Sequence, residues 1–375
     1  MRIVYFSPIA FDDLKQRPQF LAEELSKVHE VWYIDPTITG MRCLKKGGKD
    51  FISAYYNVNS NLHVLRLNGL FGLHIKLQQY DSYNVNTWFE RIQLKRLLTQ
   101  ADIIWIGYEA CYRLIRPYKK GKYQNQRKIL IYDKMDDNVA LEQNSSIKKF
   151  LATMRQELEE EADIIFASAQ VFYSTLSKKR KHVYLLPNGV GFEEISECTS
   201  TREQKNINES HRCFGYIGMI SHWFDQELIR RLAIEMPDAT IALVGPVEIE
   251  KLSLPNICYY GRVPKSDVKK WIESFDVCLY PFKKGPLLDT IDPVKLYEYL
   301  ALNKPVIAVN SLETKKYGTN IYTYNTSEEF LNLCKSPVLL PPFSTEIEKE
   351  DFFYTNSWAN RGQTAIRIIN QYCMC

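Results

Sequence analysis

Several signatures of common protein classes are missing from this sequence of 375 residues. No apolar run is long enough to span a bilayer, and the start, MRIVYFSPIAF, is typical of a strand and loop rather than a signal peptide. The nine cysteines are odd in number, are scattered and contain no C-x-x-C pair, so we expect reduced thiols in a cytoplasmic protein. The six histidines form no H-x-x-x-H pair, which argues against a zinc site.

Charge is distributed unevenly behind the small net value of +4. Between Met41 and Leu130, 16 lysines and arginines stand against five aspartates and glutamates. The same segment has an apolar series: Leu70, Phe71, Leu73, Ile75 and Leu77. One interpretation is a core-facing helix with basic residues on its solvent side. The other is a patch that docks on an anionic membrane surface or an anionic acceptor. Nucleic acid is not an expected partner, because the sequence has no recognised motif and no aromatic stacking platform.

Short apolar strands recur along the chain, most of them preceded by a helical segment and a turn. Such repeated units predict parallel sheets with helices on both faces, and the length suits two α/β domains. In the first half the expected strands are RIVYFSP (2–8), HEVWYID (29–35), DIIWIG (102–107), KILIYD (128–133), ADIIFAS (162–168) and HVYLLPNGV (182–190). In the second half they are CFGYIG (213–218), ATIALVGP (239–246), NICYYGRV (256–263), DVCLYPF (276–282) and PVIAVN (305–310).

A polar stretch separates the two series and indicates a domain boundary. We expect an N-terminal Rossmann-like domain at 1–187, a linker at 188–210 and a second Rossmann-like domain at 211–345. The remaining 346–375 is predicted to be a helical segment that packs back on the first domain, with an amphipathic helix from about Ser357. Because open parallel sheets bind ligands beyond the carboxyl ends of their strands, the cleft between the domains is the expected site.

The segment DPVKLYEYLALNKPVIAV (292–309) predicts a helix followed by a buried strand. Asp292 can cap the first turn, and Pro293 suits the first helical position. Asn303 is expected to stop the helix in a left-handed conformation, before the strand VIAV. Lys295 and Glu298 are neighbours on the helix surface, so they form either an intrahelical ion pair or part of a site.

Seven motifs in this order resemble GT-B glycosyltransferases, in particular bacterial enzymes of teichuronic-acid and exopolysaccharide biosynthesis. They are QRPQFLAEEL (16–25), YDKMDDN (132–138), LPNGV (186–190), GYIGMISHWFD (215–225), ALVGP (242–246), YYGRVP (259–264) and DPVKLYEYLALNKPVI (292–307). The resemblance spans nearly the whole chain and is concentrated in its second half. It implies a GT-B fold, in which two Rossmann-like domains face each other across a cleft.

The resemblance also implies a donor site at the helix that begins near Pro293. Its N-terminus and Lys295 would meet the diphosphate of a nucleotide-sugar, and Glu298 would bind the ribose hydroxyls. Gly218 and Gly245 would let the backbone approach the donor, although Gly245 is equally typical of a plain tight turn. The remaining implied donor residues are Arg262 and Val263 beside the nucleobase, and Tyr280 and Tyr297, which either flank the sugar or base or simply pack.

For catalysis the candidates are Asp136 and Asp137 in YDKMDDN. An inverting transfer needs a base that removes the proton of the acceptor hydroxyl, and either carboxylate could serve. The alternative is that Asp137 or Asn138 caps the helix that follows. Ser7 and Arg17, in or after the first loop, are assigned to acceptor binding, with a surface contact as the alternative for Arg17.

Two departures from the family pattern bear on the chemistry. Many retaining relatives carry a glutamate eight residues before the ribose-binding one, where Thr290 stands here, which favours inversion. There is also no D-x-D, the metal–diphosphate signature of the other large glycosyltransferase fold. We therefore expect no cofactor and no metal, with Lys295 and the helix dipole neutralising the leaving diphosphate.

These points predict a cytoplasmic glycosyltransferase that moves a sugar from a UDP-linked donor to a glycan or lipid-linked acceptor of the cell surface. The basic first half would allow it to lie peripherally on the membrane. One rival is a nucleotide-sugar epimerase of the same architecture, and another is a nucleotide-sugar-binding scaffold without catalysis. A nicotinamide oxidoreductase is disfavoured, because neither half opens with G-x-G-x-x-G.

Overall fold

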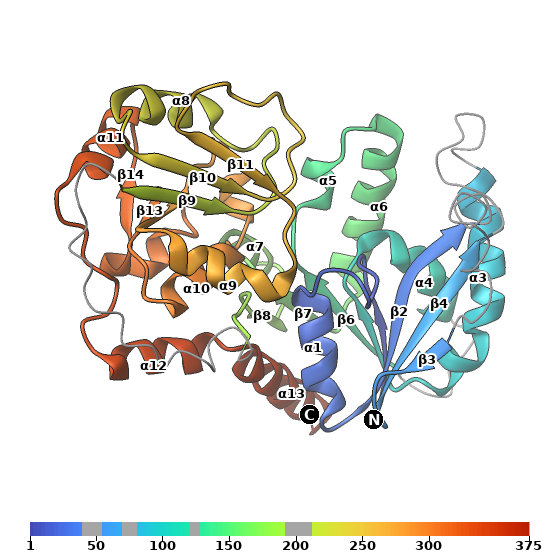
Figure 1. Ribbon diagram of the computed structural model, residues 1–375. Helices are drawn as coiled ribbons and strands as arrows, with labels where there is room; N and C mark the ends of the chain where they lie inside the picture. Colours follow the sequence, from blue (N-terminus) through green and yellow to red (C-terminus); the bar gives the residue numbers. More distant parts are fainter. Residues whose placement is uncertain (40–54, 70–80, 120–127, 192–211, 375) are drawn as a thin grey trace. The chain divides into compact units, whose positions relative to one another are not determined.

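The computed structural model describes residues 1–39, 55–69, 81–119, 128–191 and 212–374 (Figure 1). The chain divides into two compact units: Met1–Pro187 with Gly362–Cys375 form unit 1, and Asn188–Arg361 form unit 2. Of the C-terminal segment, 346–361 therefore lies in unit 2 and only the part from Gly362 in unit 1. Most of the expected linker lies outside the described residues. So does much of the basic segment, including the apolar series Leu70, Phe71, Leu73, Ile75 and Leu77.

Unit 1 contains an eight-stranded sheet in the order β3-β4-β2-β1-β5-β6-β7-β8, in which only β3 is antiparallel to its neighbour. The strands are β1 (Arg2–Phe6), β2 (Glu30–Thr39), β3 (Tyr55–Asn57), β4 (Leu62–Gly69), β5 (Ile103–Ile106), β6 (Ile129–Lys134), β7 (Ile164–Ala167) and β8 (Val183–Leu185). Every residue of β5 and β7 is buried, as expected for parallel strands that are covered on both faces.

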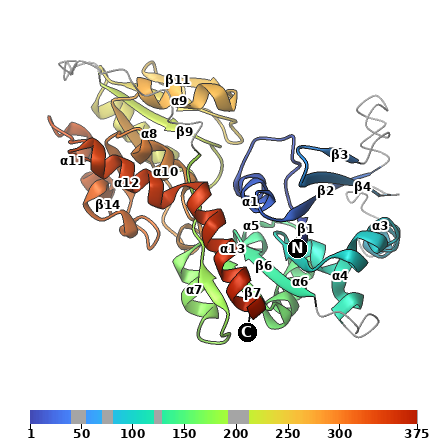
Figure 2. The same cartoon turned by 90° about the horizontal axis from the view of Figure 1, so that it is seen from below.

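The helices of unit 1 cover this sheet. They are α1 (Arg17–Ser26), α3 (Asp81–Gln100), η2 (Glu109–Cys111), α4 (Tyr112–Lys119), α5 (Asn138–Leu141), α6 (Ser145–Glu161) and α7 (Gln170–Leu176). The motif QRPQFLAEEL forms α1 as predicted, where Gln16 and Gln19 build a capping box. Helix α3 contacts β4 and lies beside α4 at one side of the sheet (Figures 1 and 2).

Unit 2 contains a six-stranded, fully parallel sheet in the order β11-β10-β9-β12-β13-β14. The strands are β9 (Cys213–Ile217), β10 (Thr240–Val244), β11 (Ile257–Gly261), β12 (Val277–Tyr280), β13 (Val306–Val309) and β14 (Tyr322–Tyr324). The chain adds β10 and β11 on one side of β9 and then continues with β12 on the other side. The sheet therefore changes direction between β9 and β12, and such switch points are where open α/β sheets bind ligands.

The helices of unit 2 are α8 (Gln226–Glu235), α9 (Lys265–Ser274), η5 (Leu288–Thr290), α10 (Val294–Ala301), η6 (Lys315–Asn320), α11 (Ser327–Lys335) and α12 (Glu346–Asn356). Because a crossover helix begins on the side where the preceding strand ends, α9 and α10 begin at the carboxyl edge of the sheet. Two predictions for α10 are confirmed: Asn303, with a φ of 53°, follows the helix, and VIAV forms the buried strand β13.

The last helix, α13 (Trp358–Met374), confirms the helix predicted from about Ser357, whose hydroxyl accepts the Asn360 N–H at 3.1 Å. Its C-terminal part packs in unit 1, where the Tyr372 ring meets the His182 ring edge-on at 5.0 Å. The Cys373 Sγ lies 3.9 Å from the Met1 Sδ, so residues near the two ends of the chain are neighbours (Figure 1). Within the described ranges, no helix combines the length and the apolar composition that crossing a bilayer requires.

Candidate functional site

The N-terminus of α10 is open, although the sequence predicted a cap there. Pro293 takes the N-cap position and offers no side-chain cap to the first turn. Asp292 was expected to be the cap, and this prediction is wrong. The Leu296 N–H donates to the Pro293 carbonyl at 3.0 Å, and the N–H groups before it have no partner within the helix, so this end of α10 has donors available for an anion.

Asp292 instead belongs to a buried cluster with Tyr297, Lys316 and Asn188. Its carboxylate accepts hydrogen bonds from the Tyr297 hydroxyl at 3.1 Å, from the Lys316 ammonium and from the Asn188 backbone N–H. Burial and the nearby Asp292 charge raise the pKa of Tyr297 to about 12. The Tyr297 side chain, predicted either to flank the donor or to pack, is therefore held in this cluster, with only 1% of its surface exposed.

Lys295 and Glu298 contact each other as predicted from their spacing, and a second lysine joins them. The Lys295 Nζ lies 2.9 Å from Glu298 Oε2, and the Lys265 Nζ lies 2.6 Å from Glu298 Oε1. Glu298 is 3% exposed, and burial by itself would raise its pKa. The two ammonium groups outweigh burial and lower the pKa of Glu298 to about 2. The first turns of α9 and α10 thus hold two cations around one ionised carboxylate.

Glycines follow or end the three adjacent strands β9, β10 and β11 at the same edge of the sheet. Gly218, Gly245 and Gly261 have φ angles of 155°, 138° and 69°. A Cβ atom on Gly245 would lie 1.9 Å from the Gly218 carbonyl oxygen, so the two turns touch through their backbones. Gly218 and Gly245, both predicted at the donor site, are therefore brought together. The position of a Cβ atom on Gly218 is itself occupied, since it would lie 2.7 Å from the Tyr216 hydroxyl.

The other predicted donor residues lie around this edge in different environments. Arg262 is exposed and Val263 is partly buried against the core, both in the turn between β11 and α9. Tyr280, the last residue of β12, is 2% exposed and stacks on Phe282 with ring centroids 4.1 Å apart. Its environment matches the packing alternative.

In unit 1 the candidate bases lie in the turn between β6 and α5. Asp137 is the N-cap of α5, where it accepts the Ala140 N–H at 3.1 Å and the Arg155 guanidinium at 2.9 Å. This is the capping role that was the alternative to catalysis. Asp136 is partly buried and also has a partner. The base role of either carboxylate stays a prediction.

Ser7 and Arg17 are both buried in unit 1. The Ser7 hydroxyl accepts from the Tyr33 hydroxyl at 2.6 Å and donates to the Ile9 carbonyl at 2.9 Å. Arg17 is paired with Asp133 at 2.7 Å and is only 4% exposed, so it is not the surface contact given as its alternative. An acceptor would have to replace these internal bonds or meet the neighbouring backbone.

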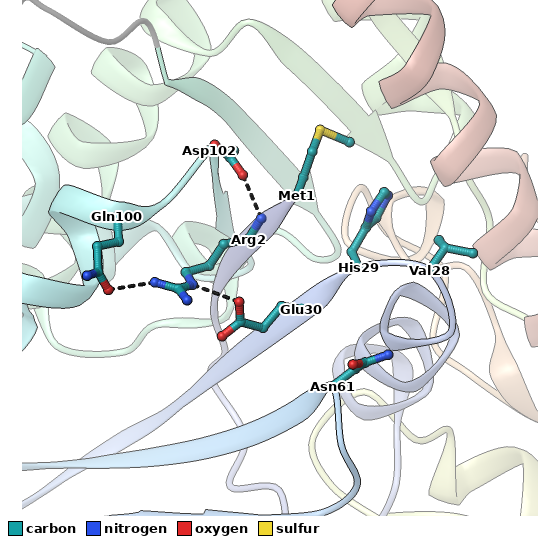
Figure 3. A pocket seen from close by; sticks show the side chains of 8 residues that line it. All are labelled: Met1, Arg2, Val28, His29, Glu30, Asn61, Gln100 and Asp102. Carbon is teal, nitrogen blue, oxygen red and sulfur yellow. Dashed lines mark hydrogen bonds and ion pairs between the residues drawn. The ribbon is translucent and has the colours of Figure 1, made fainter.

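A hollow of about 430 Å³ lies at the opposite edge of the unit 1 sheet, at the amino ends of β1, β2 and β5. Figure 3 shows Arg2 at its centre, where the side chain donates to Glu30 at 2.9 Å and to Gln100 at 2.5 Å. The Arg2 backbone N–H donates to Asp102 at 2.7 Å. None of the predicted site residues lines this hollow. It lies at the wrong ends of the strands for a nucleotide.

Two lysines of the site were not predicted. Lys265 is far in sequence from Glu298 and Lys316 is far from Asp292, so no local spacing rule links these pairs, although Lys316 also contacts Glu313 at 3.1 Å with the local i,i+3 spacing. The signal that was available for Lys265 is its position directly after YYGRVP, a motif already assigned to the nucleobase loop.

No family model matches the chain. One curated relative, named "Putative teichuronic acid biosynthesis glycosyltransferase TuaH", from Bacillus subtilis (strain 168), is 28% identical over 181 residues. This match covers 45% of the chain. The chain spans about half the length of the relative that it matches, 46%. The resemblance that the motifs indicated is confirmed over that part.

Solved structures superpose on nearly the whole chain. Sucrose-phosphate synthase from Thermosynechococcus elongatus has a TM-score of 0.74 at 11% identity, covering 99% of this chain and 98% of that one. HepE from Anabaena, in complex with UDP and glucose, has a TM-score of 0.59 at 12% identity, covering 100% and 98%. At such identities the likeness concerns the fold, and the predicted GT-B fold is confirmed.

Proposed function

We propose that this chain is a glycosyltransferase that transfers a sugar from a UDP-linked donor to a cell-surface glycan or a lipid-linked acceptor. One observation carries the proposal. The switch point of the unit 2 sheet combines two touching glycine turns, an uncapped helix N-terminus, and a buried carboxylate between two lysines. Diphosphate needs cations and N–H donors, and ribose needs hydroxyl acceptors, so this set suits a nucleotide diphosphate.

Each part of the donor has a proposed partner in unit 2. The diphosphate would lie at the N-terminus of α10, where backbone N–H groups and Lys295 offer positive charge. The ribose hydroxyls would donate to Glu298, which is ionised and can only accept. Gly218 and Gly245 are proposed to bring their backbone close to the sugar. Arg262 and Val263 are proposed to lie beside the base.

The proteins to which the chain is similar support the same substrate class. The matched relative is named as a teichuronic acid biosynthesis glycosyltransferase, and the HepE structure contains UDP and glucose. In the proposed reaction the acceptor hydroxyl attacks the anomeric carbon and the bond to UDP breaks. The hydroxyl proton passes to Asp137 or Asp136. The departing diphosphate is neutralised by Lys295 and α10, so metal independence is part of the proposal.

The proposed lipid-linked acceptor is supported by one exposed face of α3. Trp88 is 63% exposed and Ile92, one turn later, is 53% exposed. Lys95 and Arg96 follow on the same side of the helix and are also exposed. An aromatic and an aliphatic side chain next to two cations match the anionic interface of a bilayer. We propose peripheral binding through this face, called the α3 face.

Vesicle flotation tests the membrane part. The wild type should float with vesicles of phosphatidylcholine and phosphatidylglycerol at low salt, and sink with phosphatidylcholine alone. Trp88→Ser/Ile92→Ser should abolish flotation. Ile347→Ser removes an apolar group that is more exposed than either (72%) from the acidic helix α12, and it should not affect flotation. Flotation that is insensitive to salt and to the α3 variant would exclude this face.

The enzymatic part is tested with a panel of UDP-, GDP- and dTDP-sugars. Thermal shift selects the donor, and product analysis with a glycolipid acceptor, with and without EDTA, follows transfer. Lys295→Met should weaken UDP binding about 10- to 100-fold, because a hydrogen bond to a charged group contributes about 1.5–3 kcal/mol. Lys335→Met is the control, since it removes the same charge from an exposed pair with Glu235. Sugar interconversion without acceptor would indicate an epimerase, and binding without turnover a scaffold.

A further inference from the structure

Lys265 connects two elements of the proposed donor site. It is the first residue of α9, immediately after the turn that carries Arg262 and Val263. Its ammonium crosses to α10 and lies 2.6 Å from Glu298 Oε1. Lys295, by contrast, belongs to the same helix as Glu298 and meets the other oxygen at 2.9 Å. The carboxylate is therefore fixed from two directions, one within its own helix and one from outside it.

Fixing both oxygens determines how the carboxylate can receive a ligand. A carboxylate has about four acceptor positions, so two remain when each oxygen holds one ammonium group. With Lys295 alone, the terminal torsion of Glu298 is free to turn, because rotations of this kind are broad. The bond from Lys265 stops this rotation and fixes the direction of the remaining acceptor positions. The side chains of Lys265 and Lys295 are 30% and 28% exposed, whereas that of Glu298 is 3% exposed.

We propose that Lys265 is a positioning residue for sugar recognition in the nucleotide: it aims Glu298 so that the carboxylate accepts the 2′ and 3′ hydroxyls of the ribose. This inference rests on the proposed function. Lys265 acts through Glu298 and is not assigned a contact with the donor. The role makes Lys265 a determinant of specificity for ribonucleotides.

The energetic basis is the cost of an unsatisfied buried acceptor. Lys265 and Lys295 keep Glu298 ionised despite burial, so the carboxylate offers acceptors and no donor. A 2′-deoxyribose leaves one of the aimed positions without a hydrogen bond in a desolvated place. Sites of this kind discriminate strongly against ligands that lack the hydroxyl. If the carboxylate turns freely, it can meet solvent or another group instead, and the discrimination falls.

Calorimetric titration with UDP, 2′-deoxy-UDP and UMP tests the inference on the full chain. The wild type should bind UDP at least about tenfold more tightly than 2′-deoxy-UDP, which corresponds to one hydrogen bond to a charged group. Lys265→Met should bring this ratio close to one and leave the ratio of UDP to UMP affinity unchanged, because the phosphates are assigned to α10 and Lys295. Lys265→Arg should restore the preference for UDP over 2′-deoxy-UDP.

Two controls separate this role from a structural one. Lys270→Met removes a cation from the same helix, where its side chain is 80% exposed, and should retain both ratios. Lys265→Gln keeps a neutral hydrogen-bond donor, and it replaces Lys265→Met in the titrations if the methionine variant does not fold. The inference is overturned if a Lys265 variant lowers the UDP-to-UMP ratio and keeps the ribose preference, since Lys265 would then be a phosphate ligand.

The wild type distinguishes this inference from the proposed function. If it binds UDP without preferring ribose, the positioning role is wrong and the proposed donor class stands. If it binds no uridine nucleotide but another ribonucleoside diphosphate, the proposed donor is wrong, and the same ratios are then measured with that nucleotide and its 2′-deoxy form. If it binds no nucleotide, both proposals are wrong.

Discussion

The guanidinium of Arg17 and the carboxylate of Asp133 form a paired, fully buried contact in unit 1. Arg17 Nη2 lies 2.7 Å from Asp133 Oδ1, and Nε lies 3.1 Å from each carboxylate oxygen. Arg17 Nη1 also donates to the Leu186 carbonyl at 2.8 Å. The pair thus joins α1 to the end of β6 and to the chain after β8. This explains why a residue assigned to acceptor binding is also part of the framework.

Replacing Arg17 should destabilise unit 1 severely. Arg17→Met leaves the Asp133 charge buried without its partner, and such a change costs about 3–5 kcal/mol. Urea unfolding followed by circular dichroism measures the loss. Lys27→Met is the matched control: its pair with Glu24 is solvent-exposed and should contribute under about 1 kcal/mol. Equal urea midpoints for the two variants would contradict this assignment.

The pair of lysines around Glu298 predicts a stability that depends on pH. The folded-state pKa of about 2 lies below the usual value of 4.5, so the contribution is complete above about pH 5 and is lost as the pH falls towards 2. It amounts to about 3 kcal/mol. Glu298→Gln should therefore be less stable than the wild type at pH 7, and the difference in urea midpoint should shrink between pH 5 and pH 3. A difference that is constant over this range would show that ionisation of Glu298 contributes nothing.

Asp137 can be tested for catalysis separately from its structural role. Asp137→Asn keeps an N-cap side chain of similar quality but removes the carboxylate, so turnover should fall while donor affinity stays unchanged. General-base catalysis typically contributes about 10²–10⁴-fold. Arg155→Met removes the ion pair with Asp137 and leaves the carboxylate in place, so it should retain most of the turnover. If the two variants lose activity equally, the contact and not the base is responsible. Asp136→Asn is the parallel variant for the neighbouring candidate.

The touching glycine turns should not tolerate a side chain. Gly245→Ala places a Cβ atom 1.9 Å from the Gly218 carbonyl oxygen at a φ of 138°, so both crowding and backbone strain apply. Together they should cost about 2–4 kcal/mol, seen as a lower thermal midpoint. Gly285→Ala is the control, because a Cβ atom there meets nothing within 4 Å and requires no positive φ. A thermal midpoint of Gly245→Ala equal to the wild type would be inconsistent with this geometry.

Local chemistry made the strands and helix ends predictable. Short apolar runs such as IIWI and VIAV, flanked by turns and helices, indicate buried strands. Asn303 marked the end of a helix because asparagine is one of the few residue types that readily adopt a positive φ. Three strands of the described residues, β3, β4 and β14, were not predicted. Strands β3 and β14 have three residues each, too few for a periodicity to be detected, whereas the eight residues of β4 lie in the basic segment, which was interpreted by its charge.

Contacts between distant residues limited the prediction of the site. The rule that favoured Asp292 as a cap considers only the adjacent turn, whereas its carboxylate is bound by Lys316 and Asn188. Spacing detects only pairs within one helix. It therefore identified the contact between Lys295 and Glu298 and missed the contact of Glu298 with Lys265, which belongs to another helix. Asp137 had two interpretations that the sequence could not separate. A carboxylate in the turn after a strand can cap the next helix, and the same carboxylate can act as a general base.

The interrupted course of unit 1 has a consequence for biosynthesis. Its eight strands leave the ribosome before unit 2, yet the segment from Gly362 that contacts α1 and His182 is translated after unit 2. At about 5–20 residues per second, the intervening unit takes on the order of ten seconds to synthesise. Throughout that delay the surface later covered by Ala365 and Ile369, both fully buried in the finished protein, remains uncovered on the nascent chain. Unit 2 is contiguous and can complete its core before unit 1 does, so the order of completion is the reverse of the order in which the two units begin.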